Sequence, residues 1–390
     1  MKSRSPHQQT QHGVYLDYAA TTPVAPEVFA AMRPYFQEEY GNPSSFHTLG
    51  MRARDAVDRA RATIAQILHA KTSEIFFTSG GTESINLALK GVMRANKEKG
   101  NHLITTKIEH PAVLQTCQYL EKYDGIHVTS LDVTEEGYVD PREVEKSIRK
   151  STVLISVMYA NNEIGVIEPI AEIGKIARTH GVYFHTDACQ AGLLDVDAEQ
   201  LQVDLLSLNG SKIYGPKGIG VLYRRTGVPM HPLLHGGGQE QNLRSGTENV
   251  AGVVGFATAL SLVQQRKKEE RARLTRLQQL FIDGIAATIP HTFLNGPREH
   301  RLPGNVSITF EGVDTEALLI ALNDAGIFAS SGSACTSKKI GASHVLVATG
   351  ASPKRAEGTI RFTLGKYTTE EHIRYVLKTL PHLVEKLRSI

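Results

Sequence analysis

Short apolar runs rich in β-branched and aromatic residues recur along the first 225 residues of the chain. They span 74–79, 102–106, 126–131, 152–158, 182–187, 204–209 and 220–225. Runs of this length are typical of strands, and stretches between several of them, such as 170–181, repeat apolar residues at helical spacing. Strand and helix therefore alternate, which predicts an α/β layer with a mainly parallel sheet.

The pattern changes after Gly255, where a helical repeat continues for about 30 residues and predicts one long connecting helix. Two strand-like runs follow, 305–312 and 359–365, with helical stretches between and after them. The last helix is expected to open with a capping box formed by Thr368 and Glu371.

A chain of 390 residues is too long for one small core, so we expect two domains. The large domain is predicted over 15–259 and a smaller α+β domain over 260–390. Residues 1–14 are expected to be disordered or packed on the small domain, because this segment is polar and lacks the apolar core of a secretory signal.

The composition excludes several classes of function. A net charge of +3 argues against nucleic acid as the main partner. No apolar stretch approaches the roughly 18 residues of a membrane span. The three cysteines, Cys117, Cys189 and Cys335, are far apart and form no CxxC pair, which predicts neither a disulfide scaffold nor a zinc knuckle and favours a reducing cytoplasm.

Three strand ends carry residues suited to chemistry. The turn Ser79-Gly80-Gly81-Thr82-Glu83 leads from a strand into a helix, and such a turn can hold a phosphate on its backbone N–H groups. Asp187 ends another strand, and Lys212 follows a third in a glycine-rich turn. A phosphate turn, an aspartate and a lysine are the set that holds pyridoxal phosphate. His185, Asp187 and Cys189 alternate along the chain, so their side chains point to one face of the strand. This makes a metal site there conceivable, but it is the weaker alternative.

Ten motifs together resemble those of the cysteine desulfurases. In chain order they are YLDYAATTP (15–23), GNPSSFH (41–47), FTSGGTESINLALKG (77–91), IEHPAVL (108–114), NNEIGV (161–166), HTDACQ (185–190), SKIYGPKGIGVLY (211–223), HGGGQEQNLRSGTENV (235–250), SSGSACTS (330–337) and IRFTLG (360–365). These enzymes are fold-type I pyridoxal-phosphate enzymes of the class V aminotransferase group. The resemblance covers nearly the whole chain and implies a large domain with a mainly parallel seven-stranded sheet flanked by helices.

The resemblance also implies roles at the cofactor. Lys212 resembles the Schiff-base lysine, Asp187 the partner of the pyridine nitrogen, and His110 the ring that stacks on the cofactor and assists proton transfer. The further implied cofactor contacts are Gly81, Thr82, Asn162, Gln190, Asn209, Ser211 and Thr247. Thr247 resembles a phosphate ligand donated by the other subunit, which implies a homodimer. Where family members often have Ser-Gly-His-Lys, this chain has Asn209-Gly210-Ser211-Lys212, so a positive charge near the phosphate is lost.

The implied substrate is L-cysteine, converted to alanine and a persulfide on Cys335. Arg361 resembles the clamp for the substrate carboxylate, a role that suits a planar bidentate donor, and Asn162 also faces the substrate. The sulfur is expected to pass to an acceptor such as an iron–sulfur scaffold protein, or to tRNA thiolation or cofactor synthesis. A thiol that enters the site and then leaves with sulfur needs a small, polar loop such as 330–341.

Two points stay open at this stage. Lys338 and Lys339 follow Cys335 closely and either favour its thiolate or are simply solvated. The alternative functions are a selenocysteine lyase, another class V aminotransferase, or a partner protein that binds the cofactor or a sulfur carrier without turnover. The expectation for a resident metal is none.

Overall fold

The larger of the two main sheets matches the predicted α/β layer. The computed structural model describes residues 13–332, 343–352 and 356–389. The seven strands of this sheet are β2 (Ile75–Thr78), β3 (His102–Thr106), β4 (His127–Leu131), β5 (Thr152–Ser156), β6 (Tyr183–Asp187), β7 (Leu205–Asn209) and β8 (Gly220–Arg224). Their order is β2-β8-β7-β6-β5-β3-β4, and β8 alone runs antiparallel to its neighbours. The predicted mainly parallel seven-stranded sheet is confirmed.

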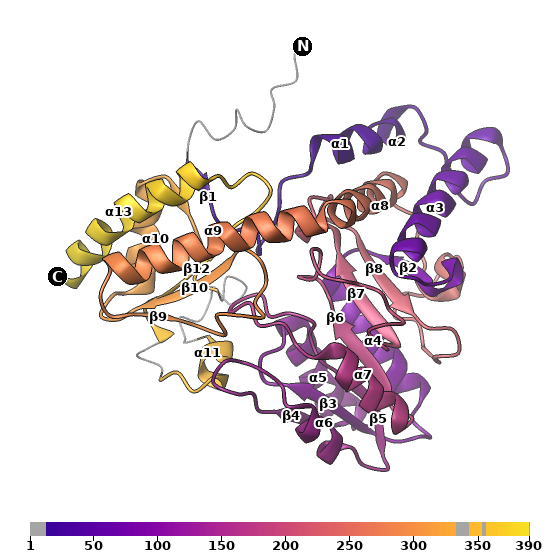
Figure 1. The fold of residues 1–390 in the computed structure, drawn as a ribbon. Helices are drawn as coiled ribbons and strands as arrows, with labels where there is room; N and C mark the ends of the chain where they lie inside the picture. Colours follow the sequence, from indigo (N-terminus) through magenta and orange to yellow (C-terminus); the bar gives the residue numbers. More distant parts are fainter. Residues whose placement is uncertain (1–12, 333–342, 353–355, 390) are drawn as a thin grey trace.

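Helices cover both faces of this sheet (Figure 1). They are α1 (Pro26–Met32), α2 (Pro34–Gln37), α3 (Thr48–Ile67), α4 (Gly81–Ala95), α5 (Pro111–Asp124), α6 (Pro141–Ser147), α7 (Ile170–Thr179) and α8 (Val250–Gln265). Helices α4 and α5 share a buried cluster with Phe76 and Leu103, whereas α3, α7 and α8 share another with Phe77 and Ile104. Neighbouring residues of a strand thus point into opposite layers, which explains why β2, β3 and β5 are buried at every position.

The second part of the chain is built around a smaller antiparallel sheet. Its strands are β9 (Thr292–Leu294), β10 (Asn305–Phe310) and β12 (Thr359–Thr363), in the order β12-β10-β9. The helices of this part are α9 (Lys267–Thr288), α10 (Thr315–Asp324), α11 (His344–Ala348) and α13 (Glu370–Arg388). The N-terminal β1 (Val14–Tyr15) pairs in parallel with β11 (Ile327–Phe328), and both contribute to the core of this part. The division at residue 259 stays a prediction.

Two local expectations about helices were wrong. The long connecting helix is two helices, because Arg266 leaves helical geometry at φ −104° and ψ 5° between α8 and α9. α8 packs on α3 and α1, whereas α9 packs on α13 and β10, so the break falls where the packing partners change.

The capping box of α13 uses Thr369 and His372 in place of Thr368 and Glu371. The reason is that the Thr368 hydroxyl already accepts a hydrogen bond from Gly365 N at 3.0 Å, which closes the preceding turn. In the part of the chain that the structure describes, no helix is both long and apolar enough to cross a membrane.

Candidate active site

The carboxyl ends of the parallel strands border a cavity of about 260 Å³. Because parallel strands present these ends at one edge of the sheet, residues far apart in the sequence meet there. The predicted site residues that line the cavity are Gly81, Thr82, His110, Asn162, Asp187, Gln190, Asn209, Lys212 and Arg361.

Lys212 reaches the cavity from a turn that follows β7. The Asn209 side chain caps this turn by accepting a hydrogen bond from Ser211 N, and the 3₁₀ helix Gly210–Lys212 follows. The Lys212 amine donates to the carbonyl oxygens of Ala19 at 2.9 Å and Ala20 at 2.5 Å. The N-terminal segment therefore orients the amine, a role that sequence reasoning missed because backbone carbonyls leave no residue signature.

Asp187 ends β6 with a nearly buried carboxylate. Its Oδ1 accepts a hydrogen bond from Cys189 N at 3.0 Å. An acceptor of this kind suits the protonated ring nitrogen of the pyridoxal phosphate that the sequence predicts.

The alternative of a metal at this strand finds no support. Both ring nitrogens of His185 lie at hydrogen-bond distance from hydroxyls, Nδ1 at 2.8 Å from Ser156 and Nε2 at 3.0 Å from Ser207. Among the described residues, no group of three or more His, Cys, Asp and Glu side chains is arranged to hold a metal ion.

His110 lies at the start of α5, where its Nδ1 accepts a hydrogen bond from Ala112 N at 3.0 Å. This bond places the proton of the neutral ring on Nε2. Burial lowers the pKa of His110; nearby Asp187 opposes this effect and Lys212 adds to it. A neutral imidazole with one N–H donor is therefore favoured near pH 7.

The turn before α4 leaves its backbone open to the cavity. At Gly81, a Cβ would lie 2.6 Å from the Cys189 sulfur and 3.5 Å from the Asn209 Cβ. Thr82 follows in the first turn of α4, where backbone N–H groups and the helix dipole favour an anion. Burial raises the pKa of the Cys189 thiol well above its usual value, so this sulfur is a neutral packing group. The turn, the aspartate and the lysine together fit pyridoxal phosphate.

The contact between Gly81 and Cys189 gives a testable prediction. Gly81→Ala should cost about 1–3 kcal/mol of stability through overpacking and should lower the affinity for pyridoxal phosphate. Cys189→Ala removes the sulfur that the new Cβ would meet. The double variant Gly81→Ala/Cys189→Ala should therefore regain most of the lost stability and most of the lost cofactor affinity. Thermal unfolding and cofactor titration by absorbance measure the two effects. A double variant no better than Gly81→Ala would show that the clash with Cys189 is not the cause.

Arg361 is a buried residue of β12. Its Nη2 donates to Asp17 Oδ1 at 2.8 Å, and its Nη1 donates to the carbonyl oxygens of Asn162 at 3.0 Å and Gly332 at 3.4 Å. Among the described residues, its Nε is buried without a hydrogen-bond partner. The guanidinium is thus fixed by Asp17, which sequence reasoning missed, and its Nε–H remains available for a further acceptor.

Other predicted residues lie elsewhere. The Ser211 hydroxyl donates to Asn209 Oδ1 at 3.3 Å, and Ser211 is absent from the cavity lining. Thr247 is exposed and is also absent from the lining of this subunit's cavity. Cys335, Lys338 and Lys339 lie outside the described residues.

A buried carboxylate, which sequence reasoning missed, contacts both described ends of the segment that contains Cys335. Glu163 Oε2 accepts from the Ser343 hydroxyl at 2.5 Å. The same oxygen lies 3.1 Å from where a Cβ on Gly332 would stand, and Gly332 has φ +81°. Its position beside Asn162 in the motif NNEIGV was the available signal.

Comparison with known proteins agrees with this geometry. The family model described as "Aminotransferase class-V" matches residues 14–376. A cysteine desulfurase IscS of Dictyoglomus turgidum is 51% identical over 97% of this chain and 96% of its own length. The corresponding protein of Methanosarcina thermophila is 49% identical over 97% of this chain and 93% of its own length.

Solved structures show the same relationship. A NifS-like protein superposes with a TM-score of 0.91 at 38% identity, covering 96% of this chain and 100% of the other. SspA in complex with cysteine superposes with a TM-score of 0.80 at 37% identity, covering 91% and 100%. Given these matches and the cavity at the strand ends, the chain belongs to the class-V aminotransferase family, among its cysteine desulfurases.

Proposed function

We propose that this pyridoxal-phosphate-dependent cysteine desulfurase binds its cofactor and L-cysteine in the strand-end cavity, with Lys212, Asp187 and His110 as the central groups. The observation that carries the proposal is that residues from five separate strand-end segments line this one cavity. When bound, the cofactor supplies an aldehyde for the substrate amine and an electron sink for the carbon atoms next to it.

Each residue has a distinct task. Lys212 would attach the cofactor through its amine and would move the proton of the substrate α-carbon. The Asp187 carboxylate would keep the ring nitrogen protonated. His110 would lie against the bound ring and offer its Nε2–H as a proton donor. Gly81 and Thr82 would hold the phosphate at the start of α4, and Gln190 and Asn209 would complete the surroundings of the cofactor. Ser211 acts through Asn209, to which its hydroxyl donates.

Arg361 and Asn162 bind the substrate in this proposal. The orphaned Nε of Arg361 supports this assignment, because a buried N–H without an acceptor is costly unless a bound group satisfies it. Asp17 acts on the substrate indirectly, since it holds the guanidinium in place.

Replacing Arg361 by lysine tests whether substrate binding depends on the planar shape of the guanidinium as well as on its charge. Arg361→Lys keeps the charge but replaces five N–H donors in one plane with three. An ammonium that reproduced the contacts to Asp17, Asn162 and Gly332 would have no N–H left for the substrate. We expect KM for L-cysteine to rise by about tenfold to a hundredfold, with a smaller change in kcat. Steady-state alanine formation measures both constants. Arg298→Lys, the same replacement on an exposed side chain outside this cavity, serves as the control. An unchanged KM in Arg361→Lys would contradict the clamp.

In this proposal, the substrate sulfur leaves the cavity as a persulfide on Cys335. Its thiolate attacks the substrate sulfur, the bond from that sulfur to the β-carbon breaks, and the electron pair stays on the β-carbon. Protonation there gives alanine, and Cys335 retains the sulfur as a persulfide. We propose that an acceptor such as an iron–sulfur scaffold protein collects it in the cytoplasm. The free thiols of Cys117 and Cys189 are consistent with a reducing compartment.

We propose a homodimer in which Thr247 serves the cofactor phosphate of the partner. Two features support it. Thr247 is exposed and does not line its own cavity, and large apolar side chains are exposed close together in the sequence: Phe29, Phe36, Tyr40 and Phe46. Clustered exposed apolar residues are typical of interfaces.

Phe46 gives the sharpest test of the dimer, since its side chain is 89% exposed. Phe46→Asp should weaken dimerisation and lower activity at low protein concentration, because a charge would be buried at the interface. Light scattering after size exclusion measures the mass. Ile320→Asp on α10 is the matched control, at 63% exposure. A wild-type monomer, or a Phe46→Asp variant that dimerises as tightly as the control, would contradict the proposal.

A further inference from the structure

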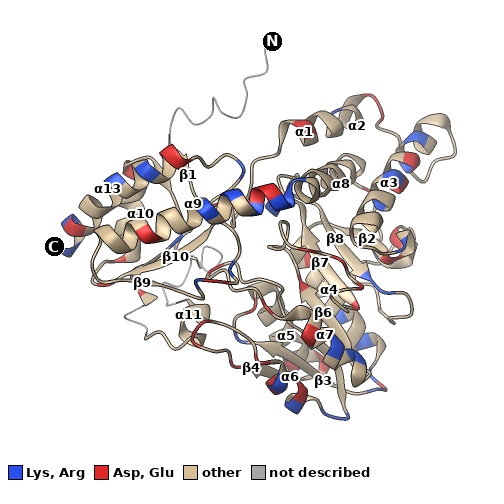
Figure 2. Cartoon of the chain, viewed as in Figure 1, with Lys and Arg blue, Asp and Glu red and all other residues tan. Residues whose placement is uncertain are grey.

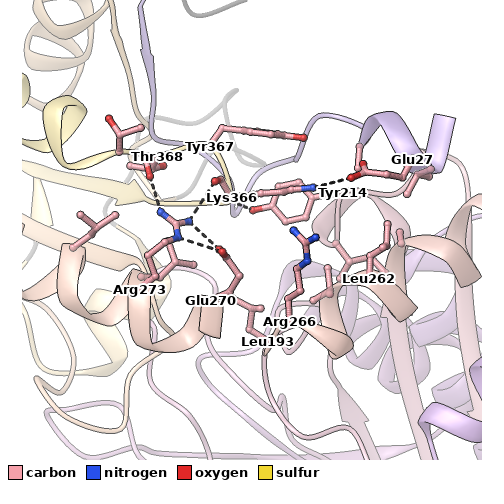
Figure 3. A pocket seen from close by; sticks show the side chains of 18 of the residues that line it. Glu27, Leu193, Tyr214, Leu262, Arg266, Glu270, Arg273, Lys366, Tyr367 and Thr368 are labelled. Carbon is pink, nitrogen blue, oxygen red and sulfur yellow. Dashed lines mark hydrogen bonds and ion pairs between the residues drawn. The ribbon is translucent and has the colours of Figure 1, made fainter. Parts of the chain in front are cut away.

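A second cavity of about 490 Å³ lies beside the junction of α8 and α9 (Figure 3). It shares no lining residue with the cofactor cavity. Its size falls within the range of about 300–1,000 Å³ that is typical of small-molecule sites. We propose that this cavity binds a small organic acid with an apolar body, and that binding of this acid changes KM for L-cysteine.

One wall of the cavity is apolar. The residues of this wall come from the start of α1, from α8 and α9, from the connection between β6 and β7, and from the turn after Lys212: Ala25, Val28, Leu193, Ile213, Ala259, Leu262, Val263, Leu274 and Leu277. Several elements thus converge on one hollow, which gives an apolar ligand body contacts on more than one side.

The opposite wall is charged, with one cation in excess. Its four cations face three acids, and three pairs form: Arg273 with Glu270 at 2.8 Å, Arg276 with Glu370 at 2.7 Å, and Lys366 with Glu27 at 3.8 Å. Figure 2 shows acidic and basic residues intermixed along the first turns of α9.

Arg266 is the remaining cation. The described residues offer it neither an ion pair nor a side-chain hydrogen bond, and Figure 3 shows its guanidinium directed into the cavity, below Tyr214 and beside Glu270. A guanidinium is a planar, always charged donor that matches a carboxylate in two parallel hydrogen bonds. The charge complement of the cavity is therefore a single carboxylate, and a cationic ligand would meet an unpaired like charge.

The cavity also contacts the two segments that carry cofactor-site residues. Tyr214 follows Lys212 by two residues, and its hydroxyl accepts a hydrogen bond from Lys366 N at 2.6 Å. Lys366 follows β12, the strand of Arg361, and Arg273 holds its carbonyl together with those of Gly365 and Thr368. A ligand that contacts Tyr214 and Lys366 can therefore shift the segments that carry Lys212 and Arg361. This gives a physical route by which the second cavity is coupled to the cofactor cavity.

Calorimetric titration of the purified holoenzyme with octanoate tests the binding. Arg266→Glu should weaken octanoate binding by at least about tenfold, because a charge-assisted hydrogen bond is replaced by repulsion. Lys268→Glu makes the same charge change two residues further on, on an exposed side chain outside the cavity, and should bind as wild type. Octylammonium should bind wild type more weakly than octanoate does. Wild type that fails to bind octanoate, or equal affinity in the two variants, would overturn the site.

The coupling is tested by KM for L-cysteine with and without saturating octanoate. We expect a change of at least about fivefold in wild type and Lys268→Glu, and no change in Arg266→Glu at the same concentration. Octanoate that binds but leaves KM unchanged in wild type would overturn the coupling. Only this readout rests on the proposed function, because the calorimetric titration requires no turnover.

Discussion

Replacing Lys212 by alanine should lower alanine formation from L-cysteine by at least about 10²–10⁴-fold, even with excess pyridoxal phosphate. The Lys212 amine lies at the cavity, where the carbonyl oxygens of Ala19 and Ala20 orient it, and the described lining contains no other lysine. A water molecule or His110 would have to move the α-proton in its place. Single-turnover alanine formation with saturating cofactor measures the loss of this step.

Lys217→Ala is the matched control. Lys217 lies five residues further along the same loop, is exposed, and does not line the cavity, so its removal should leave the rate within about twofold of wild type. A Lys212→Ala variant that retains more than about a tenth of the wild-type single-turnover rate would show that another group transfers the proton.

The strand ends show why so much of the site could be predicted from sequence. Asp187 ends one strand and Lys212 follows another, each in a run rich in apolar residues, and Gly81 sits where such a run gives way to a helical pattern. These signals are local, since strand and turn propensities act over a few residues. The parallel topology then brings the strand ends together, so locating each strand end was enough to place its residue at the cavity.

The Arg361–Asp17 pair shows what local patterns do not contain. The two residues are 344 positions apart, and they meet because Asp17 forms a bridge to Thr363 at the end of β12. That alignment depends on how the N-terminal segment packs on the second sheet. Nothing in the sequence near either residue specifies it.

The second cavity could not be predicted from the sequence either, because a cavity depends on how helices and strands pack together. The second cavity lies at the junction of α8 and α9, where Arg266 leaves helical geometry, yet the helical pattern of the sequence continues through this residue without a glycine or proline. The break reflects a change of packing partners, which is a tertiary effect that overrides helix propensity.

Replacing Cys335 by serine should abolish persulfide formation and lower steady-state alanine formation by at least about a hundredfold. A serine hydroxyl is not ionised near neutral pH and cannot carry a persulfide, so the substrate sulfur has no nucleophile to accept it. The buried thiols cannot take over. Burial raises the pKa of Cys117 and of Cys189 well above the ordinary value, which keeps both protonated. Alanine release and alkylation of the persulfide, followed by mass spectrometry, measure the two effects.

Cys117→Ala provides the control for loss of a thiol. Cys117 is 3% exposed in the cluster beneath α4 and α5, so its replacement should cost about 1 kcal/mol of stability and leave the persulfide on Cys335 unchanged. Cofactor absorbance should be the same in Cys335→Ser as in wild type, because the residues that hold the cofactor are intact. Full turnover in Cys335→Ser, with persulfide found on Cys189, would transfer the role of sulfur acceptor to the thiol that lines the cofactor cavity.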